Sequence, residues 1–97
     1  MLMAMRSFLV AYDISGDSAR ARVSARIQAW GDRIQESVFL CRADEEGRRS
    51  LTEQMVDLID PRTDALMVLP VCESCLASID AHGQYHEPEQ VSCWIVL

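Results

Sequence analysis

The chain has 97 residues, of which 49% are hydrophobic, and its formal net charge is −6. A chain of this length forms one small domain, residues 1–97, in which residues 1–5 can be an extension from an alternative start. Its acidity argues against a protein that coats nucleic acid by charge alone. Because no apolar run approaches the roughly 20 residues of a membrane span and no signal-peptide pattern is present, we expect a cytoplasmic protein without a membrane partner.

Charge is distributed unevenly along the chain. Residues 1–49 hold eight arginines against seven acids, whereas residues 50–97 hold one arginine against eight acids. The first half therefore carries +1 and the second half −7. All nine cations are arginine, which suits bidentate contacts to phosphate, although a biased genome composition explains the same count.

The first patterned segment, residues 7–15, predicts a strand that ends on a carboxylate. Apolar and aromatic side chains run from Phe8 to Tyr12 and resume at Ile14, as in a central strand covered on both faces. Ligands of open α/β sheets bind beyond the carboxyl ends of strands, which is where Asp13 would lie. Asp13 is therefore the candidate for chemistry, and a turn or helix-cap role is the alternative.

A helix is predicted over residues 19–30. Val23, Ile27 and Trp30 are spaced four and three residues apart and form one apolar stripe. Gly31 is expected to end the helix in the usual C-terminal position.

The polar face of this helix is rich in arginine. Arg22 and Arg26 lie one turn apart, with Arg20 nearby. They offer a cluster of cations close to the end of the first strand. An ordinary solvated helix face is the alternative interpretation.

Three further elements follow. Residues 33–41 begin with alternation and become continuously apolar, which predicts a second extended segment. Acidic residues then start a second helix, which is expected to run to about residue 59. Residues 65–71 read as the next strand, in which Pro70 indicates an edge or a strand end.

The last part of the chain has a weaker pattern until its final residues. Residues 75–79 are expected to be weakly structured, residues 83–90 form a polar loop, and residues 91–97 read as an apolar strand. The order of elements fits a two-layer α+β sandwich with both helices on one face. Burying residues 91–97 needs a partner, and a second copy provides one by strand addition with two-fold symmetry, so we predict a homodimer.

Cysteine spacing raises the question of a metal site. Cys72 and Cys75 have redox or metal spacing, with His82 and His86 downstream. Only six residues separate Cys75 from His82, and this gap is shorter than the usual gap between two pairs of zinc ligands. In addition, the βαβ pattern that precedes a Cys-x-x-Cys redox motif is not found before these cysteines. Zinc is therefore the weaker interpretation, and disulfides are not expected without a secretory signal. The other two cysteines lie in apolar strands and read as core residues: Cys41 and Cys93.

Two motifs occur one helix apart. They are Tyr-Asp-Ile-Ser at residues 12–15 and Gly-Asp-Arg-Ile-Gln-Glu-Ser-Val-Phe at residues 31–39, and Asp-Pro at residues 60–61 and Leu-Pro-Val-Cys at residues 69–72 add to them. Together they resemble the CRISPR-associated protein two family, the small partner of the CRISPR spacer integrase. The resemblance covers nearly the whole chain. It implies a ferredoxin-like fold, a break in the second extended segment near Ser37, and a homodimer whose C-terminal strand joins the partner's sheet.

The resemblance also implies a site. The family's aspartate at the end of the first strand matches Asp13, and two copies meet near the two-fold axis, where they can share Mg²⁺ or another divalent cation such as Mn²⁺. Members with activity cleave single-stranded RNA or double-stranded DNA in a metal-dependent way. Tyr12, Arg33, Ser37 and Phe39 match positions near that site and either hold the nucleic-acid backbone or order the loop. For Phe39, a place in the core is an equal alternative.

Three functions are compatible with these residues. The first is a metal-dependent endonuclease with Asp13 as catalytic residue and metal ligand. The second is a dimeric scaffold between CRISPR integrase dimers during spacer acquisition, and the third is a ferredoxin-like regulatory module that binds a small ligand.

Many relatives are basic, so the acidic second half weakens nucleic-acid binding by the isolated chain and leaves Arg22 and Arg26 as a local basic stripe.

Overall fold

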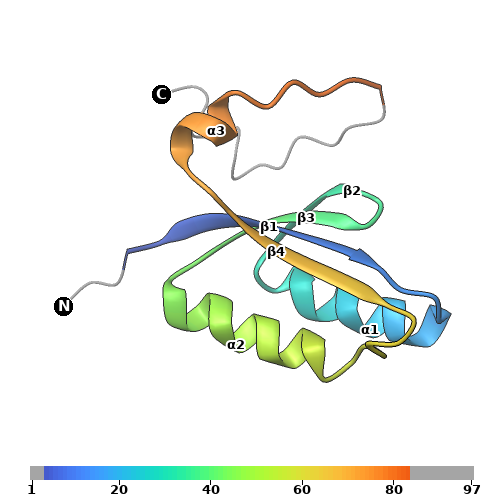
Figure 1. The fold of residues 1–97 in the computed structure, drawn as a ribbon. Coiled ribbons are helices and arrows are strands. Elements are labelled where there is room, and N and C mark those ends of the chain that lie inside the picture. Colours follow the sequence, from blue (N-terminus) through green and yellow to red (C-terminus); the bar gives the residue numbers. More distant parts are fainter. Residues whose placement is uncertain (1–3, 84–97) are drawn as a thin grey trace.

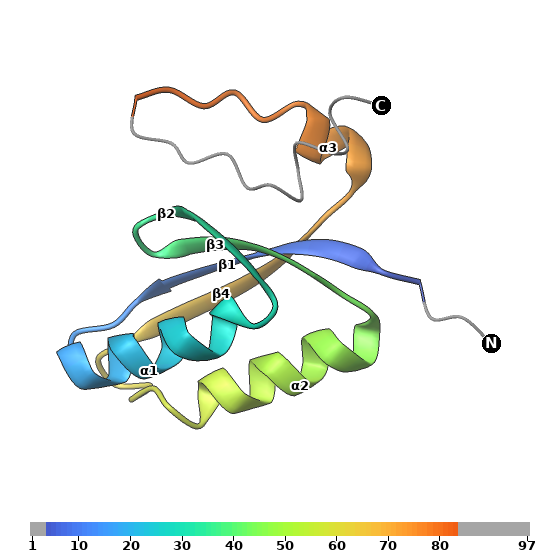
Figure 2. The same cartoon turned by 180° about the vertical axis from the view of Figure 1, so that it is seen from behind.

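The structure of the chain is a computed structural model that describes residues 4–83. A four-stranded antiparallel sheet in the order β2-β3-β1-β4 has two long helices on one face and a short third helix on the other side (Figures 1 and 2). This α+β, ferredoxin-like arrangement confirms the predicted fold class. The elements in chain order are β1 (Arg6–Asp13), α1 (Asp17–Gln28), β2 (Gly31–Gln35), β3 (Val38–Ala43), α2 (Glu45–Val56), β4 (Ala65–Val71) and α3 (Glu73–Ala77).

The central strand β1 divides its side chains between the two faces of the sheet. Phe8, Val10 and Tyr12 point toward the helices and are buried in the main core. Because successive side chains of a strand alternate, Leu9 and Asp13 lie on the opposite face, which we call the open face. The main core is completed by side chains of α1, β3 and α2: Val23, Ile27, Phe39, Cys41, Ala43, Leu51 and Met55.

The segment expected as one extended stretch is two strands. A turn at residues 36–37 separates β2 from β3, which pair with each other as a hairpin. The register shifts between Arg33 and Gln35, where the hairpin has a bulge. The break near Ser37 that the family resemblance implied is therefore present.

Gly31 does not end α1, contrary to the expectation from sequence. The helix ends at Gln28, with Ala29 as its C-cap in the right-handed region, and Gly31 is the first residue of β2. A Cβ atom on Gly31 would lie 2.1 Å from the carbonyl oxygen of Leu40 and 2.6 Å from Cα of Cys41. Glycine is required here because the backbones of β2 and β3 approach closely.

The second helix is shorter than predicted. Asp44 caps it by accepting a hydrogen bond from the backbone N–H of Gly47 at 2.7 Å, as an N-cap aspartate should. The helix ends at Val56 rather than near residue 59. Leu58 and Ile59 still pack against the main core, so the apolar pattern correctly marked buried positions but continued beyond the helix.

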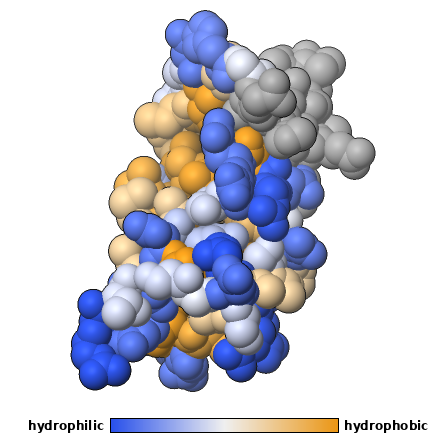
Figure 3. All heavy atoms as spheres, turned by 90° about the vertical axis from the view of Figure 1, so that its right-hand side faces the viewer, coloured by the Kyte–Doolittle hydropathy of each residue, from blue (hydrophilic) through white to orange (hydrophobic). Residues whose placement is uncertain are grey.

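The open face is partly covered by α3. Residues 75–79 were expected to be weakly structured, but Leu76 of α3 is buried there in a second cluster with Ile34 and Leu40. Along β4, Met67 and Leu69 remain 54% and 46% exposed. In Figure 3, the larger hydrophobic patches lie in the upper half of the view, on the side of the sheet that carries α3.

Strand β4 lies at one edge of the described sheet, as Pro70 predicted. The predicted strand at residues 91–97, together with Cys93, His86 and most of the predicted polar loop, lies outside the described residues. Among residues 4–83, no helix has the length and apolar character needed to cross a membrane.

Candidate functional site

Asp13 is the last residue of β1, and it is exposed at the border of the open face. It pairs in register with Ala65 at the start of β4. A shallow groove of about 280 Å³ runs beside it, lined by Ala11, Tyr12, Asp13, Ala65, Leu66 and Met67. No group of three metal-ligating side chains occurs within residues 4–83. One chain therefore presents Asp13 as a single carboxylate on a largely apolar surface.

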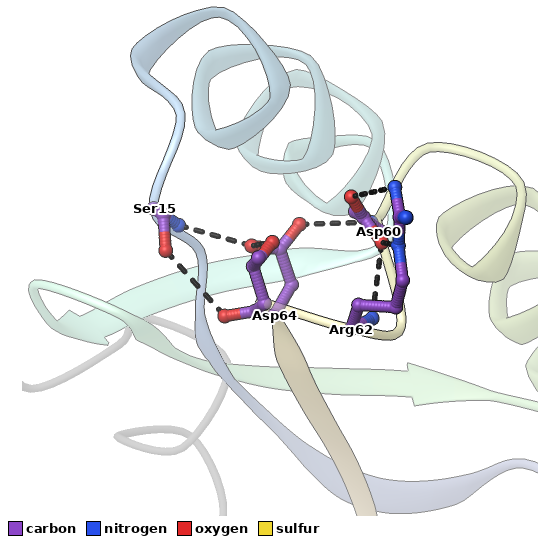
Figure 4. Close-up of polar contacts among 5 residues, drawn as sticks. Ser15, Asp60, Arg62 and Asp64 are labelled. Carbon is purple, nitrogen blue, oxygen red and sulfur yellow. Dashed lines mark hydrogen bonds and ion pairs between the residues drawn. The ribbon is translucent and has the colours of Figure 1, made fainter.

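The loop that follows Asp13 is held by an aspartate from a distant part of the sequence. Asp64 accepts a hydrogen bond from the backbone N–H of Ser15 at 3.1 Å through Oδ1, and from the N–H of Asp60 at 2.9 Å through Oδ2 (Figure 4). On the other side, Nη1 of Arg20 donates to the carbonyl oxygen of Ile14 at 2.9 Å. These contacts join the β1–α1 loop to the α2–β4 loop, and they fix the chain immediately after Asp13.

The same network predicts how stability depends on pH. The backbone N–H of Asp60, and after it that of Ser15, holds the pKa of Asp64 below its ordinary value. A depressed folded-state pKa stabilises the fold above the unfolded-state pKa of about 3.9, and this contribution is lost as the pH falls through the folded-state value. We expect Asp64→Asn to lower the unfolding free energy at pH 7 and to lose its difference from wild type in acid.

Urea unfolding between pH 7 and pH 2.5 measures this effect. Glu53→Gln, at an exposed position of α2, is the control and should follow wild type at pH 7. If the stability of Asp64→Asn stays a constant amount below wild type down to pH 2.5, the carboxylate has no such role.

Arg33 is the centre of a second group of predicted residues, on the helix side of the sheet. Its Nη2 donates to Oγ of Ser24 in α1 at 2.7 Å, and its Nη1 donates to the carbonyl oxygen of Glu36 at 2.8 Å. The guanidinium also lies 5.0 Å from the ring centre of Phe39. Arg33 therefore ties the β2–β3 turn to α1.

Tyr12 connects the turn with the end of β1. Its ring is stacked on that of Phe39, with centroids 6.3 Å apart, and its backbone N–H donates to the carbonyl oxygen of Ser37 at 3.1 Å. Phe39 itself is fully buried. A cleft of about 350 Å³ between α1 and the hairpin includes Tyr12, Ser24 and Arg33 in its lining. The side chains of Tyr12 and Asp13 nevertheless lie on opposite faces of the sheet.

Arg22 and Arg26 project from α1, on the helix side of the sheet. Both are exposed, and neither forms a hydrogen bond or an ion pair within the part of the chain that the structure describes. Arg20, which was grouped with them, instead pairs with Asp17 and binds the Ile14 carbonyl. Within one chain, the basic stripe and Asp13 are thus on different sides of the sheet.

The cysteine and histidine residues do not form a zinc centre within residues 4–83. His82 contacts Asp80 through Nε2 at 2.8 Å, while Cys72 and Cys75 are exposed at α3. Cys41 is buried in the core, as predicted.

Two supporting residues were missed by sequence analysis. Asp64 lies 49 residues from its partner Ser15, and Ser24 lies nine residues from Arg33. Ser24 is buried on α1, so a polar residue within the helix next to the apolar stripe was the available signal. For Asp64, the nearby Asp-Pro pair marked the end of a helix but not its contact with the first loop.

Similarity to known proteins agrees with this architecture. A sequence model of the family described as CRISPR associated protein Cas2 matches residues 5–79. The chain is 34% identical over 83 residues to CRISPR-associated endoribonuclease Cas2 1 of Chloroflexus aurantiacus, covering 84% of this chain and 89% of that protein. It is 38% identical over 69 residues to CRISPR-associated endonuclease Cas2 2 of Thermus thermophilus, covering 71% and 77%.

Solved structures show the same fold. The crystal structure of the hypothetical protein TT1823 from Thermus thermophilus superposes with a TM-score of 0.78 at 32% identity, covering 89% of this chain and all of that one. Streptococcus pyogenes Cas2 superposes with a TM-score of 0.75 at 22% identity, covering 79% and 99%, which shows the fold alone. The extent of the sequence match, together with the sheet order and the strand-end aspartate, means that the chain belongs to the CRISPR-associated protein Cas2 family.

Proposed function

We propose that the protein acts in CRISPR adaptation as a homodimer that hydrolyses phosphodiesters in RNA or duplex DNA with a divalent metal ion. The observation that carries this proposal is the place of Asp13, at the end of the central strand and on the border of an exposed apolar face. Relatives with 34% and 38% identity are named as an endoribonuclease and an endonuclease. Those names support the reaction class but leave the choice between RNA and DNA to experiment.

A second copy is the occupant that best fits the open face. Met67 and Leu69 expose apolar side chains in the middle of β4, and β4 has an unpaired edge within the described sheet. Covering this face with an identical one under two-fold symmetry would place the two Asp13 residues on the same interface. Strand addition by residues 91–97 of the partner would use the edge of β4.

The chemistry of Asp13 fits a hard divalent cation. Mg²⁺ and Mn²⁺ prefer oxygen ligands, and Mg²⁺ commonly uses one or two carboxylates together with water and phosphate oxygens. One Asp13 from each chain of the dimer would supply two carboxylates. A bound divalent ion would neutralise charge on the phosphodiester and promote attack by water, whereas the protein's part is to hold both carboxylates on fixed strand ends.

Nucleic acid would be held by the first half of the chain. Arg22 and Arg26 are exposed cations without partners among the described residues, and phosphate contacts are the main source of affinity for nucleic acid. Arg33, Tyr12, Ser37 and Phe39 would support the site by fixing the β2–β3 turn and the end of β1. The acidic second half would be left for contacts with proteins.

Cleavage assays with Asp13→Asn test the proposal. Wild type should cleave RNA or duplex DNA in the presence of Mg²⁺ or Mn²⁺ and should lose activity with a chelator, and Asp13→Asn should lose it with metal present. Asp57→Asn changes an exposed acid at the end of α2 and should retain activity. Equal metal-dependent rates for wild type and Asp13→Asn would contradict a catalytic role of Asp13.

The second candidate is a scaffold that bridges integrase dimers on protospacer DNA. It is favoured by the absence of any group of three metal-ligating side chains within residues 4–83 and by the −7 charge of residues 50–97, which suits protein contacts. A complex that includes Cas1 and Cas2 has a chain with the same fold, at a TM-score of 0.67 and 17% identity, covering 78% of this chain and 83% of that one. Spacer integration assays with Asp13→Asn separate the two candidates, because a scaffold should integrate normally without the carboxylate.

A further inference from the structure

Two exposed cysteines flank the first turn of α3, away from Asp13 and from the Arg33 cluster. Cys72 directly precedes the helix, Cys75 lies within it, and both are exposed. The sulfur of Cys72 lies 3.3 Å from the hydroxyl oxygen of Ser74. Leu76, next to Cys75, is buried against the open face. The turn is therefore anchored on one side while its two thiols face solvent.

The surroundings of Cys72 favour its thiolate. The Ser74 hydroxyl, followed by the backbone and thiol of Cys75, lowers the pKa of Cys72 from 9.0 to about 7. Interaction with Cys72 in turn raises the pKa of Cys75. A more acidic first thiol beside a less acidic second thiol is the arrangement found in Cys-x-x-Cys pairs that exchange disulfides.

A pocket lies next to the two cysteines. The pocket has a volume of about 480 Å³, and its lining includes Arg6 of β1, Arg42 of β3 and Glu73 of α3 besides the two cysteines. The pocket opens beside both exposed cysteines, so a small molecule has access to them. Reactive cysteines are typically accessible to the molecules with which they react.

We propose that Cys72 and Cys75 form a reversible dithiol–disulfide site that reacts with low-molecular-weight disulfides. The Cys72 thiolate attacks one sulfur of such a disulfide, whose S–S bond breaks, and one small thiolate leaves while a mixed disulfide remains on Cys72. Cys75 then loses its proton, and its sulfur attacks the Cys72 sulfur and releases the second small thiolate. The two cysteines are oxidised to one disulfide, and the small disulfide is reduced to two thiols.

Within residues 4–83, the other cysteine does not compete with this pair. Cys41 is fully buried in the core, and burial, with a smaller contribution from Asp32, raises its pKa to about 12. It therefore has neither the exposure nor the thiolate needed for exchange.

Peptide mapping of the full chain tests the proposal. The protein is equilibrated in glutathione buffers of different oxidised-to-reduced ratio, quenched in acid, alkylated and digested with a glutamyl endopeptidase. Cleavage after Glu73 places Cys72 and Cys75 in different peptides, so only a disulfide keeps those peptides joined. We expect the joined pair in wild type, its loss with dithiothreitol, and a glutathione adduct on Cys72 in Cys75→Ser.

Two results would overturn the proposal. One is the absence of the joined peptides at every glutathione ratio, and the other is a joined product that pairs Cys72 or Cys75 with Cys93 instead. A second measurement is independent of disulfide formation: alkylation of Cys72 by iodoacetamide should be half-maximal near pH 7, and Ser74→Ala should move that midpoint upward. A wild-type midpoint near pH 9 would contradict an activated thiol. Because Cys72, Ser74 and Cys75 are exposed, circular dichroism should show unchanged folding of their variants.

Discussion

Gly31→Ala should destabilise the protein by about 3 kcal/mol or more, at the upper end of what overpacking costs. The added Cβ would lie 2.1 Å from the carbonyl oxygen of Leu40 and 2.6 Å from Cα of Cys41. Both neighbours are backbone atoms of β3, and β3 is held on its other side by β1. Neither strand can move away without breaking the hairpin or the register with β1. Urea unfolding followed by far-UV circular dichroism measures the loss.

Gly16→Ala is the matched control for this substitution. Nothing lies within 4 Å of the Cβ that alanine would add there, and its backbone is extended, with φ of −84°. Loss of backbone freedom in the unfolded chain and a weaker helix N-cap act in opposite directions, so stability should change by less than about 1 kcal/mol. A Gly31→Ala protein as stable as Gly16→Ala would show that β2 and β3 do not pack as closely as described.

Gly31 also illustrates which features of the fold could be predicted. The apolar run of β1 and the apolar stripe of α1 depend on residues close in sequence. Both elements are present, with β1 ending on Asp13, but α1 spans Asp17–Gln28 instead of the predicted residues 19–30. A glycine after a helical stripe suggested a helix end for the same local reason. Gly31 is instead needed because β3 passes close to it, and the residues next to Gly31 in the sequence do not indicate the path of β3. Boundaries such as the end of α2 at Val56 were missed because buried side chains continue into the loop.

The candidate site also combines features that the sequence indicates with features that only the fold shows. Asp13 could be singled out because a buried strand and its final carboxylate are contiguous in sequence. Strand alternation puts Tyr12 and Asp13 on opposite faces, but only the sheet shows that Tyr12 lies on the helix side with Arg33 and Asp13 on the open face. The contact of Asp64 with Ser15 depends on two loops that only the complete fold brings together. Contacts between residues far apart in the sequence produce no periodic residue pattern, so a single sequence does not reveal them.

Leu69→Glu should weaken the proposed homodimer at least about 100-fold, which corresponds to about 2.8 kcal/mol of association free energy. Leu69 lies in the middle of β4 on the open face, and it pairs in register with Leu9 of β1. In one chain it is 46% exposed, so a glutamate there meets water and should leave the monomer folded. In the dimer, the carboxylate would be buried against a second apolar face without a partner, which is costly. Sedimentation equilibrium measures the dissociation constant.

Val56→Glu is the control, because Val56 is 54% exposed but lies at the end of α2, on the far side of the sheet from the open face. It should dimerise like wild type, since its added charge meets water in both states. If Asp13 acts only when paired across the interface, Leu69→Glu should also lose metal-dependent cleavage at protein concentrations where wild type is dimeric. Raising the concentration of Leu69→Glu should restore that activity, whereas Asp13→Asn should stay inactive at every concentration. A Leu69→Glu protein that dimerises as tightly as wild type would remove the open face from the interface.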